Sequence, residues 1–418
     1  MPATAQTTSA LSLAFQPIAS LSSPTPGRQW SSFPHPSLPI VAVCGIDKAV
    51  RIYSLVNFQL LAVIGGGHER SIRSCAWKPK SKELILATGS FDATVGIWKS
   101  DINDGDEKLL QSSTEVAGDD EDDRWRFAVL LDGHESEVKS VAWSSNGSML
   151  ATCSRDKSIW IWEDLEDGDD NFETVAVLQE HAADVKCLAW HPNEDCLASG
   201  SYDDTIRLWR EDADDWGQVA CLKGHEGTVW SIDWENLDKT RGNQSLIGGD
   251  VSEIANDQIS SMHPRLVSAS DDKTVRIWKR ISDKQSPQNT SSIPSIIRPT
   301  EADEVWIEET TLPPVHDLSI YSVSWSKHTG HIATTGADGR IAIYEEKQMS
   351  GDVDMHNLKE GTSWNSQWEV IRIIEAAHGE YEINHVVWAD ICEAATSGAT
   401  QEVLLSTGDD GLVKVWRM

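Results

Sequence analysis

Residues 133–164 read GHESEVKSVAWSSNGSMLATCSRDKSIWIWED and hold the pattern that decides the fold. Apolar and polar side chains alternate up to Trp143, as expected of a β-strand with one buried face. The turn SSNG leads to a second strand, MLATCS, and the tight turn RDK leads to a third, SIWIW. A fourth strand is expected near ETVAVLQ, before the next unit starts at His181. The stretch therefore predicts a small antiparallel sheet of four strands.

The same unit recurs seven times along the chain of 418 residues. In every copy an aspartate stands six residues before the aromatic residue that ends the expected third strand. These aromatic residues are Tyr53, Trp98, Trp162, Trp209, Trp278, Tyr344 and Trp416. The first strands are expected to carry Trp30, Trp77, Trp143, Trp190, Trp234, Trp325 and Trp388. A period of about 45 residues with four short strands resembles the WD40 repeat and predicts an all-β protein, a single seven-bladed β-propeller.

Four residue types recur at fixed places in the repeats. In WD40 proteins, which these repeats resemble, the histidine before the first strand contacts the aspartate between the second and third strands. That aspartate also reaches a Ser or Thr of the second strand, whose hydroxyl contacts the indole N–H of the third. The complete sets of repeats two to five are His68, Thr88, Asp92 and Trp98; His134, Thr152, Asp156 and Trp162; His181, Ser199, Asp203 and Trp209; and His225, Ser268, Asp272 and Trp278.

The other three repeats vary this set. Repeat seven has His378, Ser406, Asp410 and Trp416, repeat six ends in Tyr344, and repeat one has Val43 in place of the hydroxyl residue. Because the same offsets recur from repeat to repeat, we predict that these histidines and aspartates are structural rather than catalytic.

The two ends of the chain are expected to meet in one blade. The seventh repeat stops at Met418, directly after its third strand, while residues 11–21, LSLAFQPIASL, resemble an outer strand. We predict that this segment completes the last blade and closes the ring, which removes an open sheet edge. Residues 1–10 are interpreted as a polar lead and 11–418 as the propeller. Inserts are expected on the bottom face at 99–124, 235–263, 279–304, 345–366 and 389–401.

Composition limits the classes of partner. The net charge of −31 argues against binding to nucleic acid. Much of this charge lies in residues 101–123, 163–173 and 211–215, which are interpreted as solvated loops, with an acidic docking surface as the alternative. The seven cysteines form no CxxC pair, so buried thiols in a reducing compartment and no metal site are expected. Neither a membrane span nor a secretory signal is expected.

A candidate binding site lies on the predicted top face, where the turns between second and third strands emerge. The residue before each turn aspartate reads Ile46, Phe91, Arg155, Tyr202, Asp271, Ala337 and Asp409. Near the starts of the first strands stand Arg73, Lys139, Lys186, Trp230, Tyr321 and Asn384. With Arg155, the three cations predict a cationic arc on blades two to four, and Trp230 and Tyr321 add aromatic surface. Such a mixture suits a peptide with a carboxylate and an apolar side chain, although ordinary solvated charge is the alternative.

Repeats three and four carry a closer resemblance. The segments LLDGHESEVKSVAWSSNGSMLATCSRDKSIWIWE and VLQEHAADVKCLAWHPNEDCLASGSYDDTIRLW are similar to the WD40 proteins of cytosolic iron–sulfur protein assembly, the Cia or Ciao family. CSRDKSIWIWE is the most specific piece, because it combines Arg155 with Trp160 two residues before Trp162. The long inserts depart from the shorter members of that family.

The resemblance implies a scaffold without catalytic residues or a cofactor of its own. Members of the family work in the cytoplasm, and also in the nucleus, with a MIP18-type protein and a HEAT-repeat protein. Their complex receives iron–sulfur clusters from carrier proteins and delivers them to apo client proteins. Arg155 matches the functional top-face residue of the family, with capture of client or partner carboxylates as its implied role.

Three other functions of WD40 propellers fit the sequence less well. A substrate receptor of a ubiquitin ligase is the alternative adaptor, but WKSD, WEDL, WRED and WKRI after the third-strand tryptophans fit it poorly. A G-protein β-type subunit would need a coiled-coil helix, and residues 1–30 show no heptads. A propeller enzyme would need an acid–base pair, and the chain has no GxSxG, HExxH or Gly-rich phosphate loop.

Overall fold

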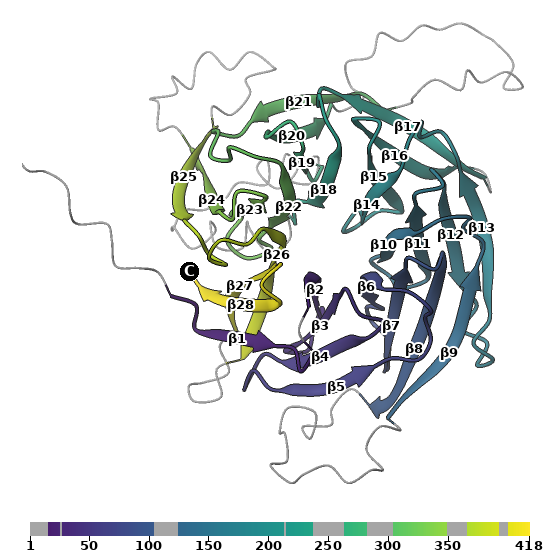
Figure 1. Ribbon diagram of the computed structural model, residues 1–418. Helices are drawn as coiled ribbons and strands as arrows, with labels where there is room; N and C mark the ends of the chain where they lie inside the picture. Colours follow the sequence, from purple (N-terminus) through teal and green to yellow (C-terminus); the bar gives the residue numbers. More distant parts are fainter. Residues whose placement is uncertain are drawn as a thin grey trace, which may run out of the picture.

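The chain forms a ring of seven four-stranded antiparallel sheets around a central axis (Figure 1). The computed structural model describes residues 16–25, 27–103, 124–212, 215–236, 263–281, 304–348, 366–392 and 400–418. This arrangement confirms the predicted seven-bladed β-propeller. The predicted polar lead at residues 1–10 lies outside the described residues, as does most of the predicted inserts. In the described part of the chain, no helix has the length and apolarity that a membrane crossing needs.

Within each blade the strands follow one another from the axis to the rim. Blades one and two comprise β2 (Gln29–Pro34), β3 (Ile40–Gly45), β4 (Val50–Ser54), β5 (Leu60–Ile64), and β6 (Ile72–Trp77), β7 (Glu83–Ser90), β8 (Thr94–Asn103), β9 (Trp125–Asp132). Blades three and four comprise β10 (Val138–Trp143), β11 (Met149–Ser154), β12 (Ile159–Asp164), β13 (Phe172–Leu178), and β14 (Val185–Trp190), β15 (Cys196–Ser201), β16 (Thr205–Asp212), β17 (Asp215–Lys223). Blades five and six comprise β18 (Val229–Trp234), β19 (Leu266–Ser270), β20 (Val275–Arg280), β21 (Trp306–Thr311), and β22 (Ile320–Trp325), β23 (Ile332–Gly336), β24 (Ile341–Gln348), β25 (Ser366–Ile374).

Blade seven is built from both ends of the described chain. Its strands are β26 (Ile383–Cys392), β27 (Thr400–Gly408), β28 (Leu412–Arg417) and, on the outside, β1 (Ala19–Ser22). The antiparallel pairing places Ala19 opposite Val415 and Ser22 opposite Leu412. The predicted closure by an N-terminal strand is therefore confirmed for residues 19–22, whereas residues 11–15 lie outside the described part.

Each gap between neighbouring blades holds its own apolar core. The tryptophan that ends the first strand of blades two to six packs toward the preceding blade, and so does Trp388 within β26 of blade seven. Several of these indoles also donate a hydrogen bond to a backbone carbonyl oxygen of that blade, at 2.9 Å from Trp77 to Phe33 and at 3.0 Å from Trp234 to Ala189. Burial of apolar area contributes about 25 cal/mol per Å², so these cores hold the blades in a fixed order.

Trp30 lies on the first strand of blade one, as predicted, but it does not occupy the position of the other six tryptophans. Trp30 is the second residue of β2, while Trp77 is the last residue of β6, so the two occupy different positions in their blades. Pro34 stands at the end of β2 where the other blades have tryptophan. The gap between blades seven and one is filled instead by residues that include Leu21 of β1. An aromatic residue near a first strand was not enough to fix its register.

Two strands of blade seven are longer than predicted. Ala389 pairs with Val403 and Cys392 pairs with Thr400, so both ends of the insert expected at 389–401 continue the sheet. Ala389 and Ile391 point into the core against blade one, and burial of these side chains explains why β26 extends. The inserts expected from 99 and 345 also begin later, because β8 continues to Asn103 and β24 to Gln348.

Candidate docking site on the top face

A buried hydrogen-bond network anchors the top of each blade. In blade three, Nδ1 of His134 lies 2.9 Å from Asp156, and Nε2 lies 2.9 Å from the hydroxyl of Thr152. Nε1 of Trp162 donates to the same hydroxyl at 3.1 Å. The same contacts, at 2.7 to 3.2 Å, join the corresponding residues of blades two, four, five and seven.

The order of contacts differs from the expected one. The histidine, and not the aspartate, reaches the Ser or Thr of the second strand, because its two ring nitrogens face opposite ways. The aspartate instead accepts hydrogen bonds from the backbone N–H after the histidine and from a hydroxyl of the third strand, as Asp156 does from Glu135 and Ser158. Burial raises the pKa of Asp156, but the hydrogen bonds from His134 and Ser158 outweigh it and leave the pKa well below its usual value. Each turn is thereby held rigidly.

A β-bulge at the start of each innermost strand aims one side chain at the top of the central channel. In blade three the pairing shifts between Val138 and Ser140, which leaves Lys139 unpaired as the bulge residue. An extra residue of this kind leaves the ladder and changes the direction of its side chain. The bulge residues of the seven blades, in chain order, are Trp30, Arg73, Lys139, Lys186, Trp230, Tyr321 and Asn384.

The bulge residues of blades two to four make the channel mouth positive. Arg73 and Lys139 form no ion pair with a carboxylate in the described part of the chain, whereas Lys186 has Asp184 at 3.2 Å. Burial lowers the pKa of Arg73. Burial also lowers the pKa of Lys139, and the positive charges of Lys186 and Arg73 lower it further despite the opposing effect of Glu137. An incoming anion would relieve this unfavourable concentration of charge.

Aromatic rings line the same mouth. Nζ of Lys139 lies 4.6 Å from the ring centre of Phe91, and Arg73 lies 5.8 Å from that of Trp30. Lys186 sits between rings, 5.3 Å from Trp230 and 5.4 Å from Tyr202. Cation–π contacts of this kind hold the cations in place without neutralising them.

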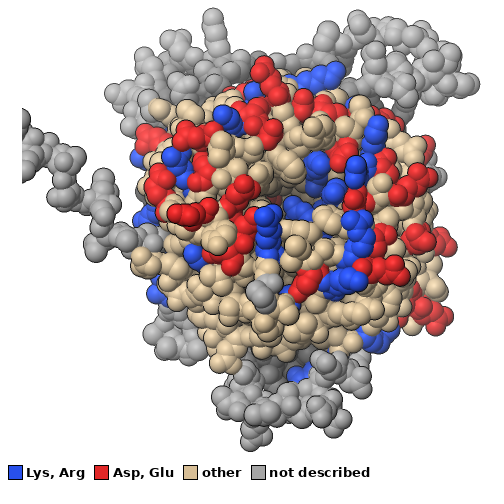
Figure 2. All heavy atoms as spheres, in the orientation of Figure 1, with Lys and Arg blue, Asp and Glu red and all other residues tan. Residues whose placement is uncertain are grey.

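The opposite side of the mouth is aromatic and acidic. Trp230 and Tyr321 meet edge to face with ring centres 5.6 Å apart. Burial, followed by the nearby carboxylate of Glu382, raises the pKa of Tyr321 to about 12, and Asp271 and Asp409 act in the same direction. Figure 2 shows Lys and Arg gathered around the central hollow and to its right, and Asp and Glu predominating to its left. The mouth is therefore polarised across the ring.

Arg155 stands above the cationic side. Its side chain is 60% exposed, and its guanidinium lies 3.4 Å from the carboxylate of Glu137. The turn that carries it is fixed, since the N–H of Arg155 donates to the carbonyl oxygen of Glu137 at 3.0 Å and Asp156 belongs to the network described above. Arg70 of the preceding blade approaches Glu137 as well, at 3.8 Å. Glu137 thus places two exposed arginines beside the channel mouth.

The structure brings the six predicted top-face residues into one arrangement and adds residues that the sequence did not single out. Arg73, Lys139, Lys186, Trp230 and Tyr321 share one position in successive blades, and Arg155 pairs with Glu137, two residues before Lys139. Sequence reasoning missed Trp30 as a member of this ring, and it also missed the roles of Arg70 and Glu137. The spacing from Gln29 to Gly45, repeated from Val138 to Ser154, contained the signal, but only the strand register makes it visible.

Comparison with known proteins gives a consistent result. The family model described as WD domain, G-beta repeat matches residues 58–99, 125–163, 172–210, 216–279 and 308–345. A protein from Emericella nidulans is 54% identical over 445 residues, which cover 100% of this chain and 99% of the relative. One from Aspergillus terreus is 55% identical over 414 residues, covering 96% and 97%, and one from Penicillium rubens is 53% identical over 447 residues, covering 96% and 98%. All three are named probable cytosolic iron-sulfur protein assembly protein 1. The chain therefore belongs to the WD40 proteins and, among them, to the family of cytosolic iron-sulfur protein assembly protein 1.

Proposed function

We propose that this protein is a non-catalytic scaffold of cytosolic iron–sulfur protein assembly, and that its top face docks partner or client proteins while clusters are delivered. The names of its relatives support the process, and the WD40 propeller supports the role of a scaffold. The cluster is cargo in this proposal and not a resident cofactor.

The proposed docking surface rests on the burial and the missing carboxylate partners of Arg73 and Lys139. Both are partly buried at the channel mouth, both lack a carboxylate partner in the described part of the chain, and burial lowers the pKa of each. A carboxylate brought in by a protein segment would pair with these groups, while Trp230 and Tyr321 offer a surface for an apolar side chain. Charge-assisted hydrogen bonds to arginine and contact with aromatic side chains dominate the energy of many interfaces.

The proposal also names the partner proteins and the cellular compartments. We infer a MIP18-type protein and a HEAT-repeat protein as the stable partners, iron–sulfur carriers and apo clients as the transient ones, and both cytoplasm and nucleus as the sites of action. The resemblance of residues 130–163 and 177–209 to the Cia or Ciao family supports this inference. A substrate receptor of a ubiquitin ligase remains the alternative adaptor.

Depletion of the protein in its native cell tests the proposal. We expect a cytosolic iron–sulfur enzyme such as isopropylmalate isomerase to lose activity, while mitochondrial aconitase keeps its activity. Restored expression of the wild-type chain should return the first activity and so excludes an indirect loss. Unchanged activity of both enzymes after depletion would discard the role in cluster delivery. A change in the abundance of particular proteins without loss of iron–sulfur activity would favour the ubiquitin-ligase alternative.

A further inference from the structure

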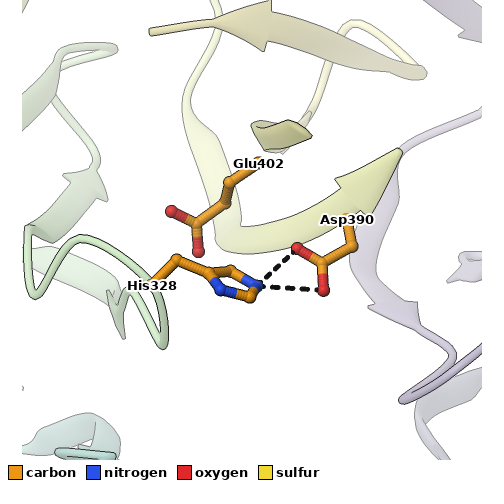
Figure 3. A group of neighbouring side chains, drawn as sticks. All are labelled: His328, Asp390 and Glu402. Atoms are coloured by element: carbon orange, nitrogen blue, oxygen red, sulfur yellow. Dashed lines mark hydrogen bonds and ion pairs between the residues drawn. The ribbon is translucent and has the colours of Figure 1, made fainter. Parts of the chain in front are cut away.

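Three side chains with metal-binding atoms converge at the bottom of the ring between blades six and seven. His328 lies in the turn between β22 and β23, Asp390 lies on β26 and Glu402 lies on β27. One ligand atom from each lies within 4.8 Å of the others. Figure 3 shows the two carboxylates turned toward the imidazole of His328. The cluster lies at the opposite end of the blades from the docking site and belongs to none of the repeated hydrogen-bond networks.

The fold forces the two carboxylates together. Asp390 and Glu402 are direct partners in the register of β26 and β27, and Asp390 lies in the part of β26 that extends into the insert expected at 389–401. Ala389 and Ile391 are buried toward blade one, so the alternation of the strand turns Asp390 toward blade six. Like charges directly opposite one another destabilise a sheet unless a cation lies between them. Within the described residues, neither carboxylate forms an ion pair with a lysine or arginine.

The third group is held in place by the turn of blade six. The hydroxyl of Ser326 donates to Oε2 of Glu402 at 2.6 Å and accepts the backbone N–H of His328 at 3.2 Å. Nε2 of His328 lies 2.8 Å from Oδ1 of Asp390 and 3.1 Å from Oδ2. Ser326 therefore fixes both the carboxylate and the start of the turn. The side chains of His328 and Asp390 are 32% and 43% exposed, which leaves room for water on the open side.

We propose that His328, Asp390 and Glu402 form a binding site for a divalent transition-metal ion. One imidazole nitrogen and two carboxylate oxygens are the ligand types that Mn²⁺, Fe²⁺, Co²⁺ and Zn²⁺ accept, and the two negative charges match the charge of the ion. Ligand atoms on one such ion at about 2.0–2.2 Å lie roughly 3–4 Å apart, so small side-chain rotations bring the three atoms into range. Water molecules complete the coordination from the exposed side.

The site would tie blade six to blade seven. His328 belongs to one blade and both carboxylates belong to the next, so a bound ion links the two sheets at the bottom rim. Blade seven also contains the strand contributed by the N-terminal segment, and the ion would reinforce the ring beside this closure. An ion that binds only the folded chain raises the thermal midpoint, and the rise grows with the ion concentration relative to the dissociation constant.

Mn²⁺ is the probe, because its preference for oxygen ligands keeps it away from the cysteines. The full-length protein is stripped with a chelator and titrated with Mn²⁺, and free Mn²⁺ is measured by its paramagnetic resonance signal. The variants are His328→Gln and Glu402→Gln. The matched control is His331→Gln, in the same hairpin, where the imidazole lies 3.6 Å from Glu345 and outside the cluster. Thermal midpoints without metal show that each variant is folded.

We expect the wild type and the His331→Gln variant each to bind one Mn²⁺ ion per chain that the His328→Gln and Glu402→Gln variants do not bind. Removal of a residue that only supports a metal ligand lowers metal affinity about 10–100-fold. Removal of a ligand itself should lower the affinity for Mn²⁺ by at least as much. Mn²⁺ should also raise the thermal midpoint of the wild type and not that of the two cluster variants. Equal binding by the wild type and both cluster variants, or no binding by the wild type at millimolar Mn²⁺, overturns the proposal.

Discussion

Leu21 lies opposite Val413 where β1 pairs with β28, and both side chains are buried in the core between the last blade and the first. The hydroxyl of Tyr53 in blade one donates to the carbonyl oxygen of Ser22 at 3.0 Å, on the same segment. Four residues near the N-terminus therefore complete one blade and also contact the next. The closure of the ring depends on a very short strand.

Replacement of Leu21 by alanine should lower the free energy of unfolding by about 2–4 kcal/mol, because it removes a buried side chain and leaves a cavity. The matched control is Ile18→Ala, whose side chain is 42% exposed and whose loss should change the free energy by less than about 0.5 kcal/mol. Urea denaturation measures both. Deletion of residues 1–22 should destabilise the whole domain, and deletion of residues 1–10 should not. Equal midpoints for Leu21→Ala and Ile18→Ala would contradict this role of β1.

Replacement of Thr152 by valine tests the hydrogen-bond network of blade three. The change keeps the shape of the side chain but leaves Nε2 of His134 and Nε1 of Trp162 without their shared partner. We expect a loss of about 1–3 kcal/mol in the free energy of unfolding for an unsatisfied buried group. Thr152→Ser retains the hydroxyl and should lose less than Thr152→Val. If the two variants are equally stable, the hydroxyl does not contribute as the geometry implies.

Reversal of charge at Arg155 should abolish the recovery of client proteins and leave the thermal midpoint unchanged. The side chain of Arg155 is 60% exposed and its one ionic partner among the described residues, Glu137, lies 3.4 Å away, so the change removes surface charge and no core contact. Arg155→Glu is compared with Arg126→Glu, since Arg126 is 51% exposed on the outer strand β9. Co-purification of clients with tagged protein is the measurement. Normal client recovery by the folded Arg155→Glu variant would end the assignment of this residue to docking.

His191 should make the protein less stable as the pH falls below neutrality. Its Nδ1 accepts backbone N–H groups from Asn193 at 3.2 Å and from Glu194 at 3.0 Å, which requires an unprotonated nitrogen. Burial lowers the pKa of His191 to about 4; Arg210 and His263 act in the same direction, while Glu194 and Glu304 oppose it. From pH about 6.5 to 4 the unfolded chain therefore binds a proton that the folded chain does not. The free energy of unfolding should fall by up to about 1.4 kcal/mol per pH unit from this group.

The variant His191→Asn removes the titrating group and keeps an oxygen that can accept the same N–H groups. Its free energy of unfolding, measured in urea at pH 7, 6 and 5, should fall less steeply than that of the wild type. His331→Gln serves as the control and should follow the wild type. Parallel pH profiles for wild type and His191→Asn would show that His191 titrates equally in the folded and unfolded chains.

The sevenfold repeat made the propeller fold predictable from the sequence. The strand register, which decides where each side chain points, was harder to predict. Each blade repeats the same short pattern, so local signals that are weak alone add up over seven copies. Trp30 misled the alignment because tryptophan occurs both at the end of a first strand and, in β2 and β18, at its bulge. A one-residue error in a strand moves a side chain to the other face, and composition does not reveal it.

The candidate docking site was predictable in its members but not in its electrostatics. The positions of Arg73 and Lys139 follow from the repeat, but their lack of a carboxylate partner depends on which side chains neighbouring blades supply. The cluster of His328, Asp390 and Glu402 was not predictable, because its residues come from two blades and one of them, Asp390, lies where an insert was expected. Contacts between repeats, and not patterns within one repeat, carry this information.

The position of β1 also constrains biosynthesis. On the ribosome, residues 19–22 emerge before every other strand of the described chain, but their partner strand β28 emerges after all of them. The nascent protein must therefore keep β1 available without its partner while the other described strands are made. Chaperones that shield such segments would be most needed in that interval, because unpaired strand edges are prone to aggregation.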